Sequence, residues 1–222
     1  MKKLLLATAI AGSVLTFSAM AESDHSVSAN VGVFTNYVWR GLTQTDDGAA
    51  VQGGFDYAHA SGLYAGIWAS NVDNAGDMEF EYDFYGGFSG EAGELGYDVG
   101  VISYHYTIED SDPTQELYLG VTFKDFGLTY YQGITSDEND KSSYIDLSAD
   151  FDLDVAALGL RAGFADNDGE TANDFAVTVS KDDFEFAQGH EFGLTLTKFS
   201  EDLGDGEDDV KALAYWTKSF DF

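Results

Sequence analysis

The sequence feature that most limits the fold is a strict alternation of apolar and polar residues. From Met78 to Phe84, apolar side chains take every second position, and Glu79, Glu81 and Asp83 take the positions between them. A helix would mix these two sets around its circumference, whereas successive side chains of a β-strand point to opposite faces. This segment is therefore predicted to be a strand with one apolar face and one acidic face.

The same alternation recurs along most of the chain and predicts an all-β fold of about twelve strands. Most of the predicted segments have the ~9–11 residues that a tilted membrane-spanning strand needs. The predicted strands cover residues 26–40, 48–59, 62–70, 77–89, 94–107, 115–124, 126–135, 142–153, 156–166, 173–181, 190–199 and 209–222.

The connections between the predicted strands alternate in character. Short turns are typical of the periplasmic end of an outer-membrane barrel and longer loops of its outer end. An even number of strands would place both termini on the periplasmic side. Acidic loops are predicted at 43–48, 71–76, 108–113, 136–140, 166–170 and 201–208, and short turns at 60–62, 89–93 and 125–127.

The acidic faces distinguish a soluble sandwich from a membrane barrel. Glu79, Glu81 and Asp83 would cost on the order of several kcal/mol each if they were buried unpaired in a dry core, and a wet lumen removes that cost. Hydrocarbon offers no partner to an open sheet edge, so a sheet that faces lipid must close. Tyr37 and Trp39 fall where an outer aromatic girdle is expected, near the end of the first predicted strand. We therefore expect a single closed antiparallel transmembrane β-barrel in a bacterial outer membrane.

The first residues have the pattern of an export signal. Lys2 and Lys3 precede an apolar run over residues 4–17, and an A-x-A site ends at Ala21. The run is shorter than the ~20 residues of a membrane-spanning helix, so a retained anchor is the weaker alternative. We predict a signal peptide over residues 1–21, cleavage between Ala21 and Glu22, and a barrel over residues 22–222.

The last residues resemble an assembly signal. Ala212, Ala214, Trp216, Phe220 and Phe222 alternate on one face of the final predicted strand. A final strand that ends in an aromatic residue resembles the signal that the barrel assembly machinery of the outer membrane reads. Trp216, Phe220 and Phe222 are therefore predicted to carry that signal, with the assembly machinery as a partner.

The charge balance limits the possible partners. The chain has 40 acidic and 10 basic residues and a formal net charge of −30. Such a chain repels phosphates, which argues against nucleic-acid binding. The expected partners are outer-membrane lipid, lipopolysaccharide and small polar solutes.

Four stretches resemble one family, the TorF-type porins. They are residues 36–45 (NYVWRGLTQT), 51–57 (VQGGFDY), 62–71 (GLYAGIWASN) and 81–88 (EYDFYGGF). Phe88 stands where the family pattern has tyrosine, and beyond about residue 106 the likeness is one of general pattern. The resemblance implies an outer-membrane barrel with a pore role, and it brings no substrate with it.

In each predicted strand, the positions that alternate with the apolar ones are expected to face the lumen, and several of them carry charged side chains. We call this choice of odd or even positions the parity of the strand. Acids outnumber bases in this set, which predicts passive diffusion of small polar solutes with a preference for cations. In the alternative, Glu79, Glu81 and Asp83 pair with bases and fill a small non-conducting barrel with a structural or adhesive role. The predicted lumen residues are Asp56, Glu79, Glu81, Asp83, Asp98, Glu116, Asp146 and Asp150, with the bases Arg40, Lys124, Arg161 and Lys211.

Catalysis and cofactors have little support. A lipid-modifying barrel enzyme, the third alternative, needs serine, histidine and an orienting residue together, and no motif proposes such a set. His190 beside Glu191 lacks a nucleophile. Asp166-x-Asp168-Gly169 resembles the start of a calcium loop without its remaining ligands. We therefore expect no enzyme activity, no catalytic or metal residues and no cofactor.

Overall fold

The computed structural model describes residues 24–109, 111–135, 142–182, 184, 187–201 and 206–222. The predicted cleavage site at Ala21 and Glu22 and the predicted loop at 136–140 lie outside these residues. Within them, no helix is long and apolar enough to cross a membrane.

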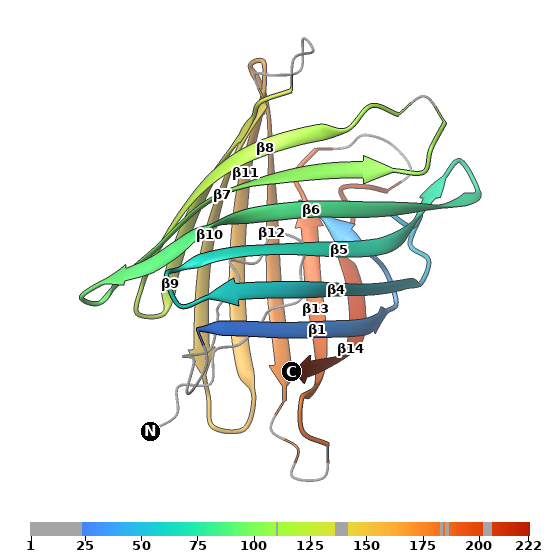
Figure 1. Ribbon diagram of the computed structural model, residues 1–222. Coiled ribbons are helices and arrows are strands. Elements are labelled where there is room, and N and C mark those ends of the chain that lie inside the picture. Colours follow the sequence, from blue (N-terminus) through green and yellow to red (C-terminus); the bar gives the residue numbers. More distant parts are fainter. Residues whose placement is uncertain (1–23, 110, 136–141, 183, 185–186, 202–205) are drawn as a thin grey trace.

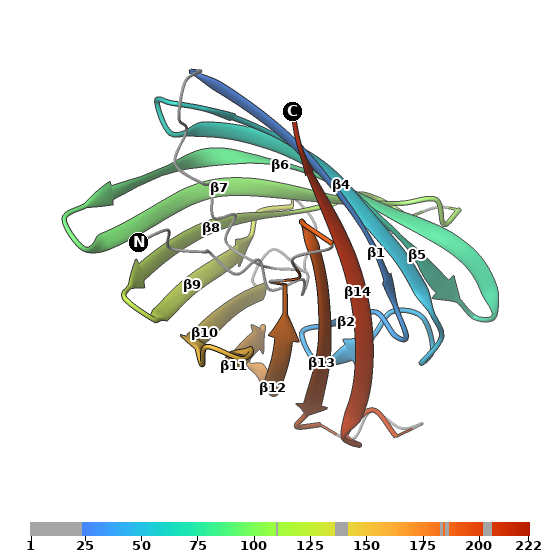
Figure 2. The same cartoon turned by 90° about the horizontal axis from the view of Figure 1, so that it is seen from below.

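The described residues form a closed antiparallel barrel of twelve long strands in the order β1-β14-β13-β12-β11-β10-β9-β8-β7-β6-β5-β4 (Figures 1 and 2). This confirms the prediction of an all-β barrel of about twelve strands. The barrel strands are β1 (His25–Phe34), β4 (Ala50–His59), β5 (Leu63–Asn74), β6 (Asp77–Ala92), β7 (Leu95–Tyr106), β8 (Thr114–Phe123), β9 (Phe126–Gly133), β10 (Ser142–Asp152), β11 (Ala157–Asn167), β12 (Glu170–Lys181), β13 (His190–Phe199) and β14 (Lys211–Asp221).

The barrel closes where the first and last strands meet. β1 pairs with β4 on one side and with β14 on the other, with a register from Ser28↔Asp221 to Phe34↔Tyr215. Because this pairing is antiparallel, β1 begins and β14 ends at the same end of the barrel. The ring therefore leaves none of its twelve strands with an open edge.

The two faces of the sheet differ sharply in polarity. Outward positions carry large apolar side chains, such as Val51 on β4 and Leu119 on β8, of which Leu119 is 55% exposed. Inward positions carry buried polar side chains, such as Asp98 and Thr195. The period of two read from the sequence thus corresponds to an apolar exterior and a polar interior.

The first predicted strand is too long. β1 ends at Phe34, and the chain then forms a separate two-stranded hairpin of β2 (Val38–Trp39) and β3 (Leu42–Thr43). Tyr37 is 3% exposed, so it does not belong to an outer girdle. The prediction failed because alternation alone cannot show where a strand leaves the sheet.

Two of the predicted acidic loops are tight turns. β5 and β6 are joined by Ala75 and Gly76, and β11 and β12 by Asp168 and Gly169. All four residues have positive φ angles, between 54° and 95°. Turns of this kind match the twist of antiparallel strands, which allows the strands to extend into segments that look like loops in the sequence.

Candidate functional site in the barrel lumen

Residues 35–49 fold into the barrel, and we call this segment the inward hairpin. Val38 pairs with Thr43 and Trp39 with Leu42, so Arg40 and Gly41 form the two-residue turn at its tip. Their φ angles are 48° and 85°, as in a type I′ turn. A left-handed conformation is unfavourable for arginine, which indicates that its contacts hold it there.

The tip of the inward hairpin reaches the opposite wall of the barrel. Arg40 donates from Nη1 to Glu116 Oε1 at 2.8 Å and from Nη2 to Oε2 at 2.7 Å. Its guanidinium lies 4.2 Å from the ring centroid of Tyr144 on β10 and 5.0 Å from that of Tyr131 on β9. In the strand order β9 stands six places from β1 in either direction, so the hairpin crosses the full width of the lumen.

The charge of Arg40 is maintained by its partner. Burial lowers the pKa of the guanidinium, but the charge and hydrogen bonds of Glu116 outweigh burial and raise this pKa above its ordinary value. The contact is therefore a bidentate ion pair, which is the strong geometry for arginine and a carboxylate.

Two further contacts fix the tip. A Cβ on Gly41 would lie 2.7 Å from Cβ of Asp174 on β12 and 3.0 Å from Cδ2 of Phe199 on β13, so the turn needs glycine to fit against this wall. The Trp39 ring packs edge-on against Tyr104 of β7, with centroids 5.9 Å apart. The hairpin tip is thus held on several sides.

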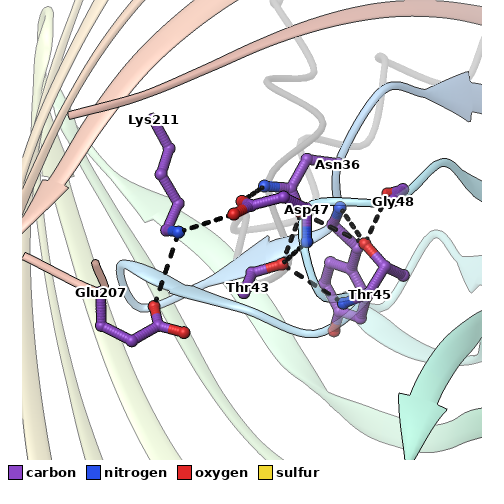
Figure 3. A network of polar contacts seen from close by, with 8 residues as sticks. Asn36, Thr43, Thr45, Asp47, Gly48, Glu207 and Lys211 are labelled. Atoms are coloured by element: carbon purple, nitrogen blue, oxygen red, sulfur yellow. Dashed lines mark hydrogen bonds and ion pairs between the residues drawn. The ribbon is translucent and has the colours of Figure 1, made fainter. Parts of the chain in front are cut away.

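The base of the hairpin is a hydrogen-bonded network (Figure 3). Asn36 donates to Asp47 at 2.7 Å and accepts from Thr43 Oγ1 at 2.7 Å. Thr45 Oγ1 donates to the carbonyl of Gly48 at 2.6 Å. The ammonium group of Lys211 on β14, a predicted lumen residue, donates to Asp47 Oδ2 at 3.1 Å. The hairpin is therefore tied to the wall from which it departs.

The hairpin divides the free space of the lumen. A vestibule of about 380 Å³ opens among the turns and loops at one end, and its lining includes Thr43, Gln44, Asp73, Tyr106 and Glu207. A cavity of about 30 Å³ lies between the hairpin and strands β4 and β11–β14, with Gln52, Arg161, Asp174, Thr195 and Thr197 in its lining. The smaller cavity has room for only about one or two water molecules, so the hairpin leaves little free space on this side of the lumen.

Most of the predicted lumen acids are buried on inward positions of their strands. Arg161 donates to Asp146, and Thr107 donates to Glu79. Asp150 is half-buried on β10. The buried predicted acids are Asp56, Glu81, Asp83, Asp98, Glu116 and Asp146.

Lys124 was wrongly assigned to the lumen. It lies in the exposed turn between β8 and β9, with a φ of 56° and its ammonium group 5.1 Å from the centroid of the Phe123 ring. The predicted strand ran one residue too far. Parity has no meaning once the chain has entered a turn.

Sequence reasoning missed the tyrosines that hold these acids. Six inward tyrosines in the described chain donate hydrogen bonds to inward carboxylates, and five of these bonds are 2.6–2.8 Å long. These tyrosines occupy the same inward-facing alternate positions of their strands as the acids, and this pattern in the sequence could have identified them. The pairs are Tyr64 with Asp98, Tyr85 with Asp56, Tyr104 with Glu116, Tyr106 with Glu81, Tyr144 with Asp174 and Tyr215 with Glu191.

Glycines make room for several of these rings. Asp56, Gly66 and Tyr85 form one row across β4, β5 and β6. A Cβ on Gly66 would lie 2.4 Å from ring atoms of Tyr85, so the ring lies flat over the glycine on its way to Asp56. The tyrosines therefore follow the wall and leave the centre of the lumen to the hairpin.

One serine and one histidine bear on the enzyme alternative. Ser103 Oγ and His105 Nε2 on β7 are 2.9 Å apart, and the imidazole stacks on Tyr82 with centroids at 5.3 Å. No hydrogen-bond partner orients Nδ1 among the described residues. His190 accepts a hydrogen bond from Trp216 Nε1 at 2.9 Å. The described chain also has no cluster of three or more His, Asp or Glu side chains that could hold a metal ion.

Comparison with known sequences gives the family. Residues 18–197 match the model of a family described as bacterial proteins of unknown function (Gcw_chp). The chain belongs to the Gcw_chp family. No curated protein matches this Gcw_chp member. The narrower resemblance to TorF-type porins stays a prediction.

Solved structures share the barrel fold. A KdgM porin superposes with a TM-score of 0.62 at 10% identity, over 87% of this chain and 99% of the porin. A KdgM porin in complex with disordered oligogalacturonate gives 0.57 at 7% identity, over 89% and 98%. A structure from a study of in-meso crystallization of membrane proteins gives 0.55 at 7% identity, over 89% and 84%. At these identities the likeness shows the fold alone.

Proposed function

We propose that this Gcw_chp barrel lies in the bacterial outer membrane and lets small polar solutes diffuse passively, with a preference for cations. The closed ring and the apolar exterior support the membrane location, because hydrocarbon requires that every backbone polar group be paired within the protein. The fold shared with a KdgM porin supports a pore role.

The cation preference rests on one observation: most lumen carboxylates are held by neutral donors. Arg40 and Arg161 are each neutralised by an acid, Glu116 and Asp146. The other tyrosine-bound carboxylates, such as Asp98, have no cationic side chain among their described hydrogen-bond partners, so no base offsets the charge of their ionised form. An excess of fixed negative charge along a narrow path attracts cations and repels anions.

This preference is the opposite of what a polyanion would need. One of the matched KdgM porin structures holds oligogalacturonate, whose uronate groups are negatively charged. In the present lumen such a chain would meet Asp56, Glu81 and Asp83 at close range. We therefore propose small cations and neutral polar solutes for this protein.

The inward hairpin sets the size limit of the proposed path. The cavity beside it holds about 30 Å³, so we propose that solutes much larger than water pass only when the hairpin shifts. Refolded protein in planar bilayers tests the proposal through single-channel conductance and the reversal potential in a salt gradient. We expect small conductance steps and a reversal potential of cationic sign. An anionic sign would refute the preference. The absence of channels in both wild type and Arg40→Ala would favour a structural or adhesive barrel.

Targeting and orientation follow from the same proposal. We propose cleavage of the signal after Ala21, both termini in the periplasm, and the vestibule end facing out toward lipopolysaccharide. Trp216, Phe220 and Phe222 would direct the chain to the assembly machinery. N-terminal sequencing of the membrane-inserted protein tests the cleavage, and protease treatment of intact cells tests the exposure of the vestibule loops.

An enzyme remains the second candidate because Ser103 and His105 are in contact. A serine nucleophile needs a base and a group that orients the base. The described residues supply no such orienting group on the second imidazole nitrogen. We expect no phospholipid or ester hydrolysis above that of a Ser103→Ala variant. Turnover that depends on Ser103 would overturn this expectation.

A further inference from the structure

Two neighbouring lumen carboxylates each have an oxygen that lacks a partner. Glu81 and Asp83 on β6 are 3% and 4% exposed. Glu81 Oε1 accepts a hydrogen bond from Tyr106 at 2.7 Å, but Glu81 Oε2 and Asp83 Oδ1 are buried without a hydrogen bond. Buried carboxylates that are neither paired nor solvated destabilise a fold strongly, so a positive charge at this place would stabilise it.

The described part of the chain supplies no such positive charge. Its lysines and arginines all have other contacts. Arg40 binds Glu116, Arg161 binds Asp146 and Lys211 binds Asp47, while the remaining four contact backbone carbonyls or an aromatic ring. These four are Lys181 at Val155, Lys198 at Asp208, Lys218 at Gln188 and Lys124 at Phe123.

Aromatic side chains surround the two acids. In the register of the sheet, Asp83 stands beside Trp68 on β5 and Tyr104 on β7. Tyr37 of the inward hairpin packs edge-on against Trp68, with ring centroids 5.4 Å apart. Burial, the charges of Glu81 and Asp83 and hydrogen bonding to Glu81 raise the pKa of Tyr37 well above its ordinary value, so its hydroxyl stays protonated beside the two acids. Aromatic faces attract cations, most strongly where water is excluded.

We propose that Glu81 and Asp83 form a binding site for one monovalent cation, closed on the lumen side by Tyr37 of the inward hairpin. Two carboxylates match one or two positive charges, and the described residues contain no third acid or histidine that would complete a chelating site for a metal. The ligand is an alkali ion or the ammonium group of a small solute. This proposal rests on the proposed function because the lumen is the route by which the cation arrives.

The test uses the full mature chain in detergent micelles and measures urea unfolding by tryptophan fluorescence. Potassium chloride or methylammonium chloride is titrated at constant ionic strength, which is kept with tetraethylammonium chloride, whose cation is much bulkier than potassium or methylammonium. We expect a saturable rise of the unfolding midpoint. At ten times Kd the folded-to-unfolded ratio should rise about 11-fold. Comparison of the potassium and methylammonium titrations shows whether the site binds an alkali ion, an organic ammonium group or both.

Two variants and a matched control assign the effect. Asp83→Asn and Glu81→Gln should each abolish the saturable rise and should be at least as stable as wild type without the cation. Asp98→Asn is the control, because Asp98 is an equally buried lumen aspartate that accepts a hydrogen bond from Tyr64. This control should retain the rise. The same cation dependence in Asp83→Asn as in wild type would overturn the site.

A proton is the competing counter-charge. If stability rises on acidification and shows no dependence on potassium or methylammonium, a shared proton neutralises the pair and the proposal is wrong. ²⁰⁵Tl NMR on the wild-type protein gives a second readout that needs no variant. The Tl⁺ resonance should broaden when the ion binds, and it should narrow again when K⁺ displaces it. If the cation binds but the protein does not conduct, the proposed function is refuted and the site stands. If the protein conducts cations selectively but binds none at Glu81 and Asp83, the site is refuted and the proposed function stands.

Discussion

Arg40 and Glu116 join the two sides of the lumen through hydrogen bonds of 2.8 and 2.7 Å. Arg40 belongs to the inward hairpin, which leaves the barrel wall between β1 and β4 and enters the lumen, and Glu116 belongs to β8 on the far side. Among the described residues, this ion pair is the one that joins the tip of the inward hairpin to the far wall, and removing it is the most direct way to widen the proposed path.

Arg40→Ala should increase single-channel conductance and decrease stability. Breaking a buried ion pair typically costs about 3–5 kcal/mol, because the remaining charge loses its partner. Glu116→Gln should act in the same direction, and the double variant should cost less than the sum of the two single variants. Lys124→Ala, in an exposed turn, is the control and should leave conductance unchanged. Equal conductance in wild type and Arg40→Ala would show that the hairpin does not limit the path.

Tyr85→Phe should destabilise the barrel by about 1–3 kcal/mol, because Asp56 then stays buried without its donor. Urea unfolding in micelles measures the change. Adding Asp56→Asn to Tyr85→Phe should recover part of the loss, since a neutral amide is easier to bury. Tyr97→Phe, on an outward position, is the matched control and should have a smaller effect.

Gly66→Ala should also destabilise the barrel, by about 1–3 kcal/mol, because the new Cβ would displace the Tyr85 ring. The same substitution in a Tyr85→Ala background should cost clearly less, since the ring is then absent. An equal cost in both backgrounds would show that the glycine is needed for a reason other than this ring.

Leu119→Arg tests the membrane location. Leu119 points outward from the middle of β8. An arginine near the centre of a bilayer costs a barrel about 2–4 kcal/mol, whereas a surface substitution in water changes stability by about 0.5 kcal/mol or less. The free energy of folding into lipid vesicles measures this cost, with Ala75→Arg in the β5–β6 turn as the control.

Cation preference should weaken as salt concentration increases. The Debye length falls from about 10 Å at 0.1 M to about 3 Å at 1 M, so fixed lumen charges act over a shorter range. Reversal potentials at the two concentrations, with the same concentration ratio across the bilayer, give the comparison. A preference that is independent of salt would indicate selection by size and not by the lumen carboxylates.

The strands could be predicted from the sequence because a period of two needs no knowledge of the partner strand. The predicted segments 77–89 and 190–199 correspond closely to β6 and β13. The inward hairpin could not be predicted in this way. Tyr37 and Trp39 continue the alternation of β1, and only the Arg40-Gly41 turn, which needs two positive φ angles, marks the departure.

The candidate site was predictable in part. Parity indicates which side of a strand faces inward, but it does not give the register between strands, which depends on turn geometry. The row of Asp56, Gly66 and Tyr85 depends on that register. The same limit hid the partner of Arg40, because Glu116 lies 76 positions away in the sequence.

The pairing of β1 with β14 has a consequence for how the molecule forms. Seven residue pairs from Ser28↔Asp221 to Phe34↔Tyr215 unite segments from the two ends of the described chain. Until β14 is in place, both β1 and β13 present unpaired backbone groups that hydrocarbon cannot satisfy. The barrel should therefore insert into lipid only when β14 has paired with both β1 and β13. A chain that lacks β14 should remain an open sheet with two free edges, which is prone to aggregation.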